Sequence, residues 1–129
     1  DTQWRRGLYV HWQRQFLHPM MKAFDAPSRE ECTTQRPQSN TPLAALVLLN
    51  DPTFIEAAKA FTHRIIKNGG NSASERLEYA FKESISRSPD KFESETLIAL
   101  LDDPQTTEPE SWTPIARAIL NLAETNLRR

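Results

Sequence analysis

Hydrophobic residues recur at helical spacing in several blocks of the chain. The clearest block is 52–68, where Phe54, Ala58, Phe61 and Ile65 lie three or four positions apart and share one helix face. Three further blocks show similar spacing: Leu77, Phe81 and Ile85; Phe92, Leu97, Leu100 and Leu101; and Trp112, Ile115, Ile119 and Leu122. The pattern predicts amphipathic helices.

Helix-start signals mark the beginnings of these blocks. Thr41-Pro42 and Asp51-Pro52 each pair a side-chain oxygen that can cap a helix with a proline suited to the first helical position. They predict helices at about 42–50 and 52–68 with a sharp bend near Asn50. Two S/D-x-x-E capping boxes, Ser72 with Glu75 and Asp90 with Glu93, predict the next two starts, and the last helix is expected from about Ser111, with Pro114 in its first turn.

The N-terminal residues also show helical periodicity. Leu8, Trp12 and Phe16 recur every four positions, which predicts a helix with these side chains on one buried face. It should stop near His18, because Pro19 disfavours helical backbone in the residue before it. A chain that begins within such a helix is expected to lack sequence upstream.

Residues 20–40 break the pattern. This stretch is polar, contains Pro27 and Pro37, and has no apolar periodicity. Connections of this length inside compact domains are commonly functional or disordered. We therefore predict one long polar connection there.

Together these elements predict an all-α fold, a compact orthogonal bundle of five or six helices. Only three glycines are present, too few for an architecture of strands and tight turns. Residues 1–129 are expected to form a single helical domain or the C-terminal part of a larger one. The predicted core is Leu46, Leu49, Phe54, Phe61, Ile65, Phe81, Leu97, Ile115 and Ile119.

Charge and composition exclude several classes of function. The 17 acidic and 16 basic residues nearly cancel, so no overall field attracts nucleic acid. No apolar run approaches the roughly 18 residues of a membrane span. The single cysteine, Cys32, excludes a CxxCH haem attachment and a multi-cysteine zinc site, so we expect no cofactor within this chain.

The polar connection holds the densest group of candidate functional side chains: Asp25, Arg29, Glu31, Arg36 and Asn40. Carboxylates beside arginines are used in acid–base and anion-binding sites, since neighbouring charges shift carboxylate pKa values. Exposed loops also collect charges for structural pairing, and this interpretation is favoured. The expected role is to brace the loop through local hydrogen bonds.

Two histidines, His11 and His18, are candidates for a haem or metal contact, because imidazole is a common transition-metal ligand. Seven positions separate them, and no carboxylate follows either one at the spacing typical of a helical metal site. Ordinary surface or partly buried histidines are the favoured interpretation. No metal site is predicted.

The stretch from Phe24 to Ala57, FDAPSREECTTQRPQSNTPLAALVLLNDPTFIEA, resembles the C-terminal region of a planctomycete-type, cytochrome-associated family of unknown function. The flanking segments RRGLYVHWQRQFLHPMMKAF, ERLEYAFKESISRSPDKFESETLIALL and SWTPIARAILNLAETNLRR are similar to the same family. The resemblance implies a large exported bacterial protein in which this region closes the chain, behind another domain and in some members a c-type cytochrome module. It implies an extracytoplasmic location and haem c elsewhere in the full-length protein, and it carries over no activity.

Two main hypotheses remain open. The first is a non-catalytic helical module that packs onto upstream domains of the same protein. The second is part of a hydrolytic or redox enzyme whose pocket Asp25, Arg29, Glu31 and Arg36 complete together with upstream residues. A weaker third hypothesis gives His11 or His18 a contact to a haem held elsewhere.

Overall fold

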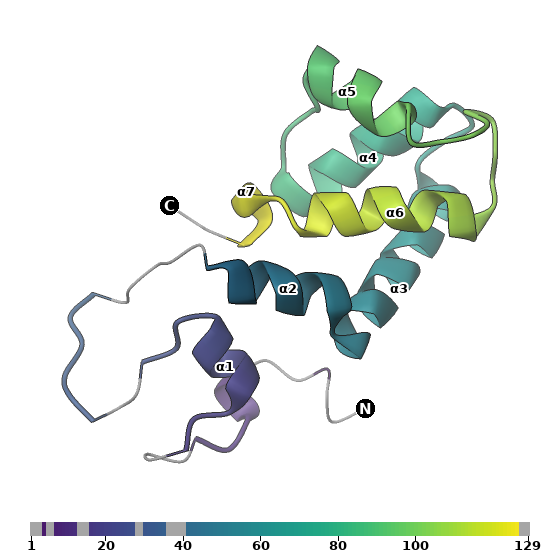
Figure 1. The fold of residues 1–129 in the computed structure, drawn as a ribbon. Coiled ribbons are helices and arrows are strands. Elements are labelled where there is room, and N and C mark those ends of the chain that lie inside the picture. The colour runs from purple at the N-terminus through teal and green to yellow at the C-terminus, as the bar shows by residue number, and fades with distance from the viewer. Residues whose placement is uncertain (1–3, 5–6, 13–15, 28–29, 36–40, 127–129) are drawn as a thin grey trace.

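The structure is a computed structural model that describes residue 4 and residues 7–12, 16–27, 30–35 and 41–126. Every regular element in this part of the chain is helical (Figure 1). In chain order the elements are η2 (Gly7–Tyr9), α1 (Pro19–Ala23), α2 (Pro42–Asn50), α3 (Pro52–Asn68), α4 (Ala73–Ile85), α5 (Lys91–Ile98), α6 (Pro109–Leu120) and α7 (Ala123–Asn126). The predicted all-α class is confirmed.

Helices α2 and α3 begin where the sequence signals predict. The Thr41 Oγ1 accepts a hydrogen bond from the Ala44 N–H at 3.2 Å, and the Asp51 Oδ1 accepts one from the Thr53 N–H at 2.8 Å. Asp51 has extended backbone angles, φ −67° and ψ 130°, so the chain turns sharply between the two helices. The predicted bend is confirmed.

Both predicted capping boxes are present. At the start of α4, the Ser72 Oγ accepts from the Glu75 N–H at 3.2 Å, and the Glu75 carboxylate accepts from the Ser72 N–H at 3.2 Å. At the start of α5, Asp90 and Glu93 make the same reciprocal pair at 2.7 and 2.8 Å. These bonds satisfy amide donors that a helix start would otherwise leave unpaired.

Gly69 ends α3 and lets α4 pass close to it. The Gly69 N–H donates to the Ile65 carbonyl at 2.8 Å, which closes the last helical turn. A Cβ atom at this position would lie 2.5 Å from the Ile65 carbonyl oxygen and 2.8 Å from the Arg76 Cα. Only glycine fits where the backbones of α3 and α4 approach so closely.

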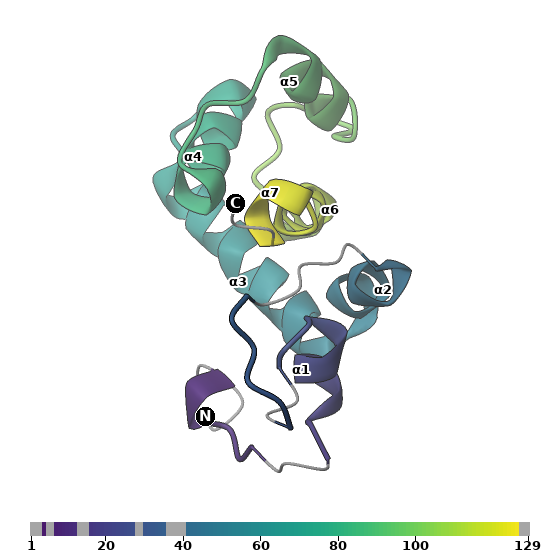
Figure 2. The same cartoon turned by 90° about the vertical axis from the view of Figure 1, so that its left-hand side faces the viewer.

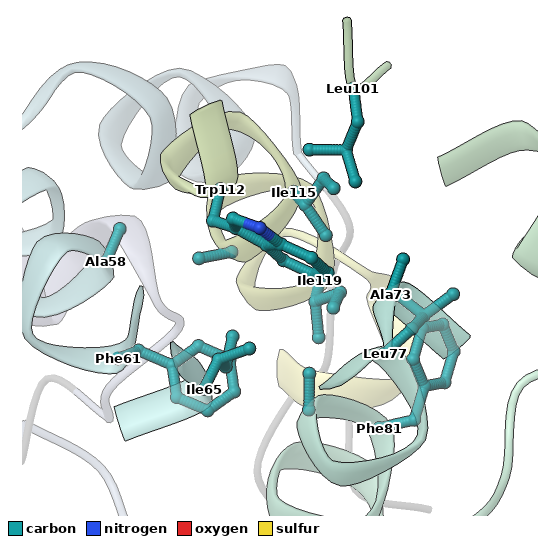
Figure 3. Close-up of a cluster of buried hydrophobic side chains, with 12 residues drawn as sticks. Ala58, Phe61, Ile65, Ala73, Leu77, Phe81, Leu101, Trp112, Ile115 and Ile119 are labelled. Atoms are coloured by element: carbon teal, nitrogen blue, oxygen red, sulfur yellow. The ribbon is translucent and has the colours of Figure 1, made fainter. Parts of the chain in front are cut away.

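The hydrophobic core lies between α3, α4 and α6 (Figure 3). Helix α3 makes its most extensive contacts with α6 and also packs against α2 and α4. Figure 2 looks along α6 and shows α4 and α5 at one end of the molecule and α1 at the other. The buried cluster is Ala58, Phe61, Ile65, Ala73, Leu77, Ala80, Phe81, Leu101, Trp112, Ile115, Ala116 and Ile119.

The predicted core list is right for the helices that surround this cluster and wrong for α2. Five predicted members are buried, namely Phe61, Ile65, Phe81, Ile115 and Ile119, and Phe54 and Leu97 are partly buried. Leu46 and Leu49 are instead exposed, at 57% and 37% of their surface. The reason is that α2 lies at the edge of the fold, packed mainly against α3 and α1.

The predicted N-terminal helix is wrong in the described residues. A short 3-10 turn, η2, is followed by non-helical backbone at residues 10–12, and Leu8 and Phe16 are exposed. Pro19 does not follow a helix end but occupies the first turn of α1, a position where its missing N–H costs nothing. The residue before it, His18, is extended at ψ 133°, as proline requires.

Helix α6 begins two residues earlier than predicted. It starts at Pro109, so Pro114 lies in the second turn and not in the first. The Thr113 Oγ1 donates to the Pro109 carbonyl at 2.7 Å. The carbonyl that loses its ladder donor to Pro114 is that of Glu110, so the Thr113 bond adds to the first turn and does not replace the missing one.

Candidate functional site

The polar connection is only partly described. Asp25 is partly buried and follows α1 with a left-handed backbone at φ 56°, and Glu31 is exposed. Arg29, Arg36 and Asn40 lie outside the described residues. Whether these five side chains brace the loop or converge on a pocket therefore stays a prediction.

The two candidate histidines are separate surface residues. Both His11 and His18 are exposed, and the His18 side chain makes no capping bond to α1. Within the part of the chain that is described, no three His, Cys, Asp or Glu side chains lie together as metal ligands. Cys32 is exposed and is followed by Thr33, Thr34 and Gln35, so it does not stand in a CxxCH motif.

The outer face of α2 is an unusual surface. Over Pro42–Asn50 the helix has no charged residue, and apolar residues occupy all of its sides. Helices that are apolar all round are normally buried. Here Ala44 is buried, whereas Leu43, Leu46 and Leu49 are exposed at 58%, 57% and 37%, and we call these three side chains the leucine face.

The last carbonyls of α2 accept three hydrogen bonds, two of them local and one from α6. The Asn50 Nδ2 donates to the Leu46 carbonyl at 3.0 Å, the Asp51 N–H to the Val47 carbonyl at 2.9 Å, and the Arg117 Nη2 of α6 to the Leu49 carbonyl at 2.5 Å. Carbonyls at a helix C-terminus need such external donors. The bond from Arg117 ties the end of α2 to α6.

A polar hollow of about 340 Å³ lies outside the junction of α3 and α4. Its side chains pair with one another: the Asn68 Nδ2 donates to the Tyr79 hydroxyl at 3.3 Å, and Lys82 pairs with Glu78 at 2.6 Å. Glu75 is occupied by the α4 cap, and hydrogen bonds from the Ser72 and Asn71 amides lower the pKa of its carboxyl. A carboxylate held ionised in this way is a poor proton donor near neutral pH.

Arg87, which follows the end of α4, forms ion pairs with glutamates of α5 and α7. Its Nη1 and Nη2 donate to the two Glu93 carboxylate oxygens at 2.7 and 2.6 Å, and its Nε donates to Glu124 on α7 at 2.8 Å. The bidentate bonds from Arg87 lower the pKa of Glu93 to about 2, and the same bonds raise the pKa of Arg87. The guanidinium also lies 5.2 Å from the Phe81 ring centroid, so this network ties α4, α5 and α7 to the core.

Arg76 is a buried arginine whose hydrogen bonds go to neutral groups. Its Nε donates to the Gly70 carbonyl at 3.1 Å and its Nη1 to the Thr106 carbonyl at 2.9 Å. The guanidinium lies 5.8 Å from the Trp112 ring centroid, and the Trp112 Nε1 donates to the same Thr106 carbonyl at 3.0 Å. These contacts fix the 102–108 loop against α4 and α6, which is a structural role.

Sequence reasoning missed the leucine face and the three arginines. The periodicity of apolar residues shows that α2 is hydrophobic but not which of its sides other helices cover. Arg76 and Arg117 stand in ordinary amphipathic helices and Arg87 stands in the bend after α4, with no motif around any of them. The one available signal for α2 was a run of nine uncharged residues in which no side of the helix is polar. Such a run is typical of a helix buried on all sides.

The sequence profile of one family, described as PSD1, protein of unknown function (DUF1553), matches residues 1–101. The search of curated proteins found no match, and neither did the search of solved structures. Among the described helices, none is both long and apolar enough to cross a membrane.

Proposed function

We propose that this chain, which belongs to the PSD1 family of proteins of unknown function (DUF1553), is a non-catalytic helical module that docks onto another part of a longer protein. The observation that supports the proposal is the leucine face. Leu43 and Leu46 are more than half exposed on a helix whose composition is that of a buried one. Exposed apolar side chains on a helix of this composition support an interaction site on α2.

The small size of the face indicates what covers it. Stable complexes between separate proteins bury roughly 20–30 residues on each side. Three leucines fall far short of that, so a free partner would bind weakly. A partner in the same polypeptide is present at an effective concentration of about millimolar, which makes a small interface sufficient. The proposed partner is therefore part of the same polypeptide, and the resemblance, which implies another domain ahead of this region, supports a segment upstream of this chain.

The proposal extends to where the protein acts. The resemblance of residues 24–57 supports an exported bacterial protein of planctomycete type, with a c-type cytochrome module in some members. Such a module would carry its own haem, and this helical part would help to position it. Fractionation of the native cells with haem staining tests this, and recovery of the protein in the cytoplasmic fraction would contradict it.

The docking proposal is tested by thiol labelling in the full-length protein. Cys32 is first replaced by serine, because it is exposed and would react. Leu46→Cys then places a thiol on the leucine face, and Phe92→Cys places the control thiol on α5 at a site 76% exposed. A maleimide is added, and labelling at each site is followed by peptide mass spectrometry.

Labelling at position 46 is expected to be at least about tenfold slower than at position 92, because only the undocked fraction reacts. Equal rates at the two positions would show that the leucine face is open in the full-length protein. That result would overturn the proposed function.

A further inference from the structure

Arg117 borders the leucine face and is incompletely paired. Its Nη2 donates to the Leu49 carbonyl at 2.5 Å, whereas its Nε is buried and has no hydrogen-bond acceptor. Buried side-chain donors nearly always have an acceptor, because burial removes the hydrogen bond that the group made to water. Because the Nε is closed off, a partner can reach Arg117 only through the terminal nitrogens of its partly buried guanidinium.

The charge of Arg117 also has no counter-ion among the described residues. The other arginines with ion pairs there, Arg64 and Arg87, both meet glutamates. Asp51, the carboxylate nearest to Leu49 along the chain, accepts instead from the Thr53 N–H at the start of α3. A carboxylate from outside the chain would supply what Arg117 lacks.

We propose that the segment that docks on the leucine face carries an aspartate or glutamate that pairs with Arg117. This inference rests on the proposed function and adds the chemistry of the partner. The expected partner is a helix with an apolar stripe, since a row of leucines one turn apart accepts the ridge of another helix. Its carboxylate lies where that stripe meets the C-terminus of α2. Planar guanidinium and carboxylate groups form paired, charge-assisted hydrogen bonds, which fix the register of docking.

Zero-length cross-linking of the full-length protein tests the pairing. In the Arg117→Lys variant the charge remains and an amine stands in place of the guanidinium. A water-soluble carbodiimide activates a nearby carboxylate as an O-acylisourea, the lysine amine displaces the urea by-product, and an amide bond forms with net loss of water. The matched control is Arg64→Lys, whose partner Glu83 lies within this chain.

The expected products are distinct. The control variant should give a peptide that joins position 64 to Glu83, and Arg117→Lys should give one that joins position 117 to an aspartate or glutamate outside residues 1–129. Adding Leu46→Gln to each variant should reduce the link at position 117 several-fold, because that link depends on docking. The link between position 64 and Glu83 should stay unchanged.

Three outcomes would overturn the inference. They are no link at position 117 when the control link forms, a link only to a carboxylate within residues 1–129 such as Asp51, and a link to a second copy of the protein. The first outcome would mean that no carboxylate of the docked segment approaches Arg117. If thiol labelling at position 46 is still slow in that protein, the docking proposal stands and only the acidic partner is wrong.

Discussion

At the scale of single residues, three arginines hold helices together by different chemistry. Arg76 binds carbonyls of two loops, Arg87 binds two glutamates, and Arg117 binds the end of another helix. Hydrogen bonds to carbonyls persist when carboxylates are protonated, whereas ion pairs do not. The three contacts should therefore differ in their response to pH.

The Arg87–Glu93 pair gives the clearest prediction of pH dependence. The folded-state pKa of Glu93 is about 2, below the ordinary value of 4.5, so its contribution to stability is complete above pH 4.5 and is lost as the pH falls toward 2. Replacing Glu93 by Gln should lower the free energy of unfolding at pH 7 by roughly 1–2 kcal/mol, a value reduced for the partial exposure of the pair. Denaturant unfolding between pH 2 and 7 measures both effects.

The control variant is Glu95→Gln on the same helix. Glu95 is exposed and only 4.0 Å from Lys91, so its removal should change stability little at any pH. If Glu93→Gln and the native chain lost stability in parallel below pH 4.5, the ionised Glu93 would not be the source of the pH dependence.

Phe61 stabilises the fold through the burial of its side chain. It lies in the α3 stripe that packs against α6, and its truncation to Ala should cost about 3–5 kcal/mol through lost apolar contacts and a residual cavity. Phe92→Ala, at a site 76% exposed, should cost far less. Chemical denaturation compares the two, and a loss under about 1 kcal/mol for Phe61→Ala would mean that its stripe contributes little to the core.

At the scale of helices, the starts of α2 to α5 could be predicted because the signals are local. Thr41, Asp51, Ser72 and Asp90 cap amides two or three residues away, so the sequence contains both partners of each bond. The N-terminal prediction failed because a four-residue repeat of apolar side chains does not fix a helix without tertiary contacts to bury them.

The candidate site could not be predicted in the same way. Exposure of Leu46 depends on which sides of α2 the helices α1 and α3 cover, and that is a property of the whole arrangement. The incomplete pairing of Arg117 depends on an approach between α6 and α2, where Arg117 and Leu49 are 68 positions apart along the chain. The loop residues that the sequence favoured, such as Glu31, were chosen only because charged residues are dense there. A high density of charge occurs both in solvated loops and in functional sites, so it does not distinguish the two.

The junction of α3 and α4 gives a prediction at this scale. Gly69→Ala would place a Cβ atom 2.8 Å from the Arg76 Cα of α4, so the two helices must separate, and 2.5 Å from the Ile65 carbonyl oxygen at the end of α3. We expect a loss of about 1–3 kcal/mol, the usual cost of overpacking. Gly7→Ala is the control, because its Cβ would meet only the flexible end of Met21 at 3.3 Å. Thermal melts that shift equally for both variants would contradict a rigid contact at Gly69.

At the scale of the whole molecule, the family match and the folded unit have different boundaries. The match ends at residue 101, whereas α6, which follows, supplies Trp112, Ile115, Ala116 and Ile119 to the core. Residues 42–101 alone would therefore expose the inner faces of α3 and α4. The matched region is expected to depend on α6 for its stability.

Truncation tests this dependence. A chain that ends at Glu108 should lose cooperative unfolding and be digested quickly by protease, because the core loses one of its three main helices. A chain that ends at Asn126 retains every described helix and should resist protease as the native chain does. Equal resistance of the two chains would show that α6 is dispensable.

The meeting of Arg76, Thr106 and Trp112 also has an optical consequence. The emission of an indole depends on the polarity around its ring and on the groups that contact it. Trp112 is fully buried, with a guanidinium beside its ring and its N–H on a loop carbonyl, whereas Trp4 is half exposed. Subtracting the fluorescence of a Trp112→Phe variant from that of the native chain should isolate a blue-shifted band. A shift of that band to the red would signal that the 102–108 loop has left α4 and α6, without any added dye.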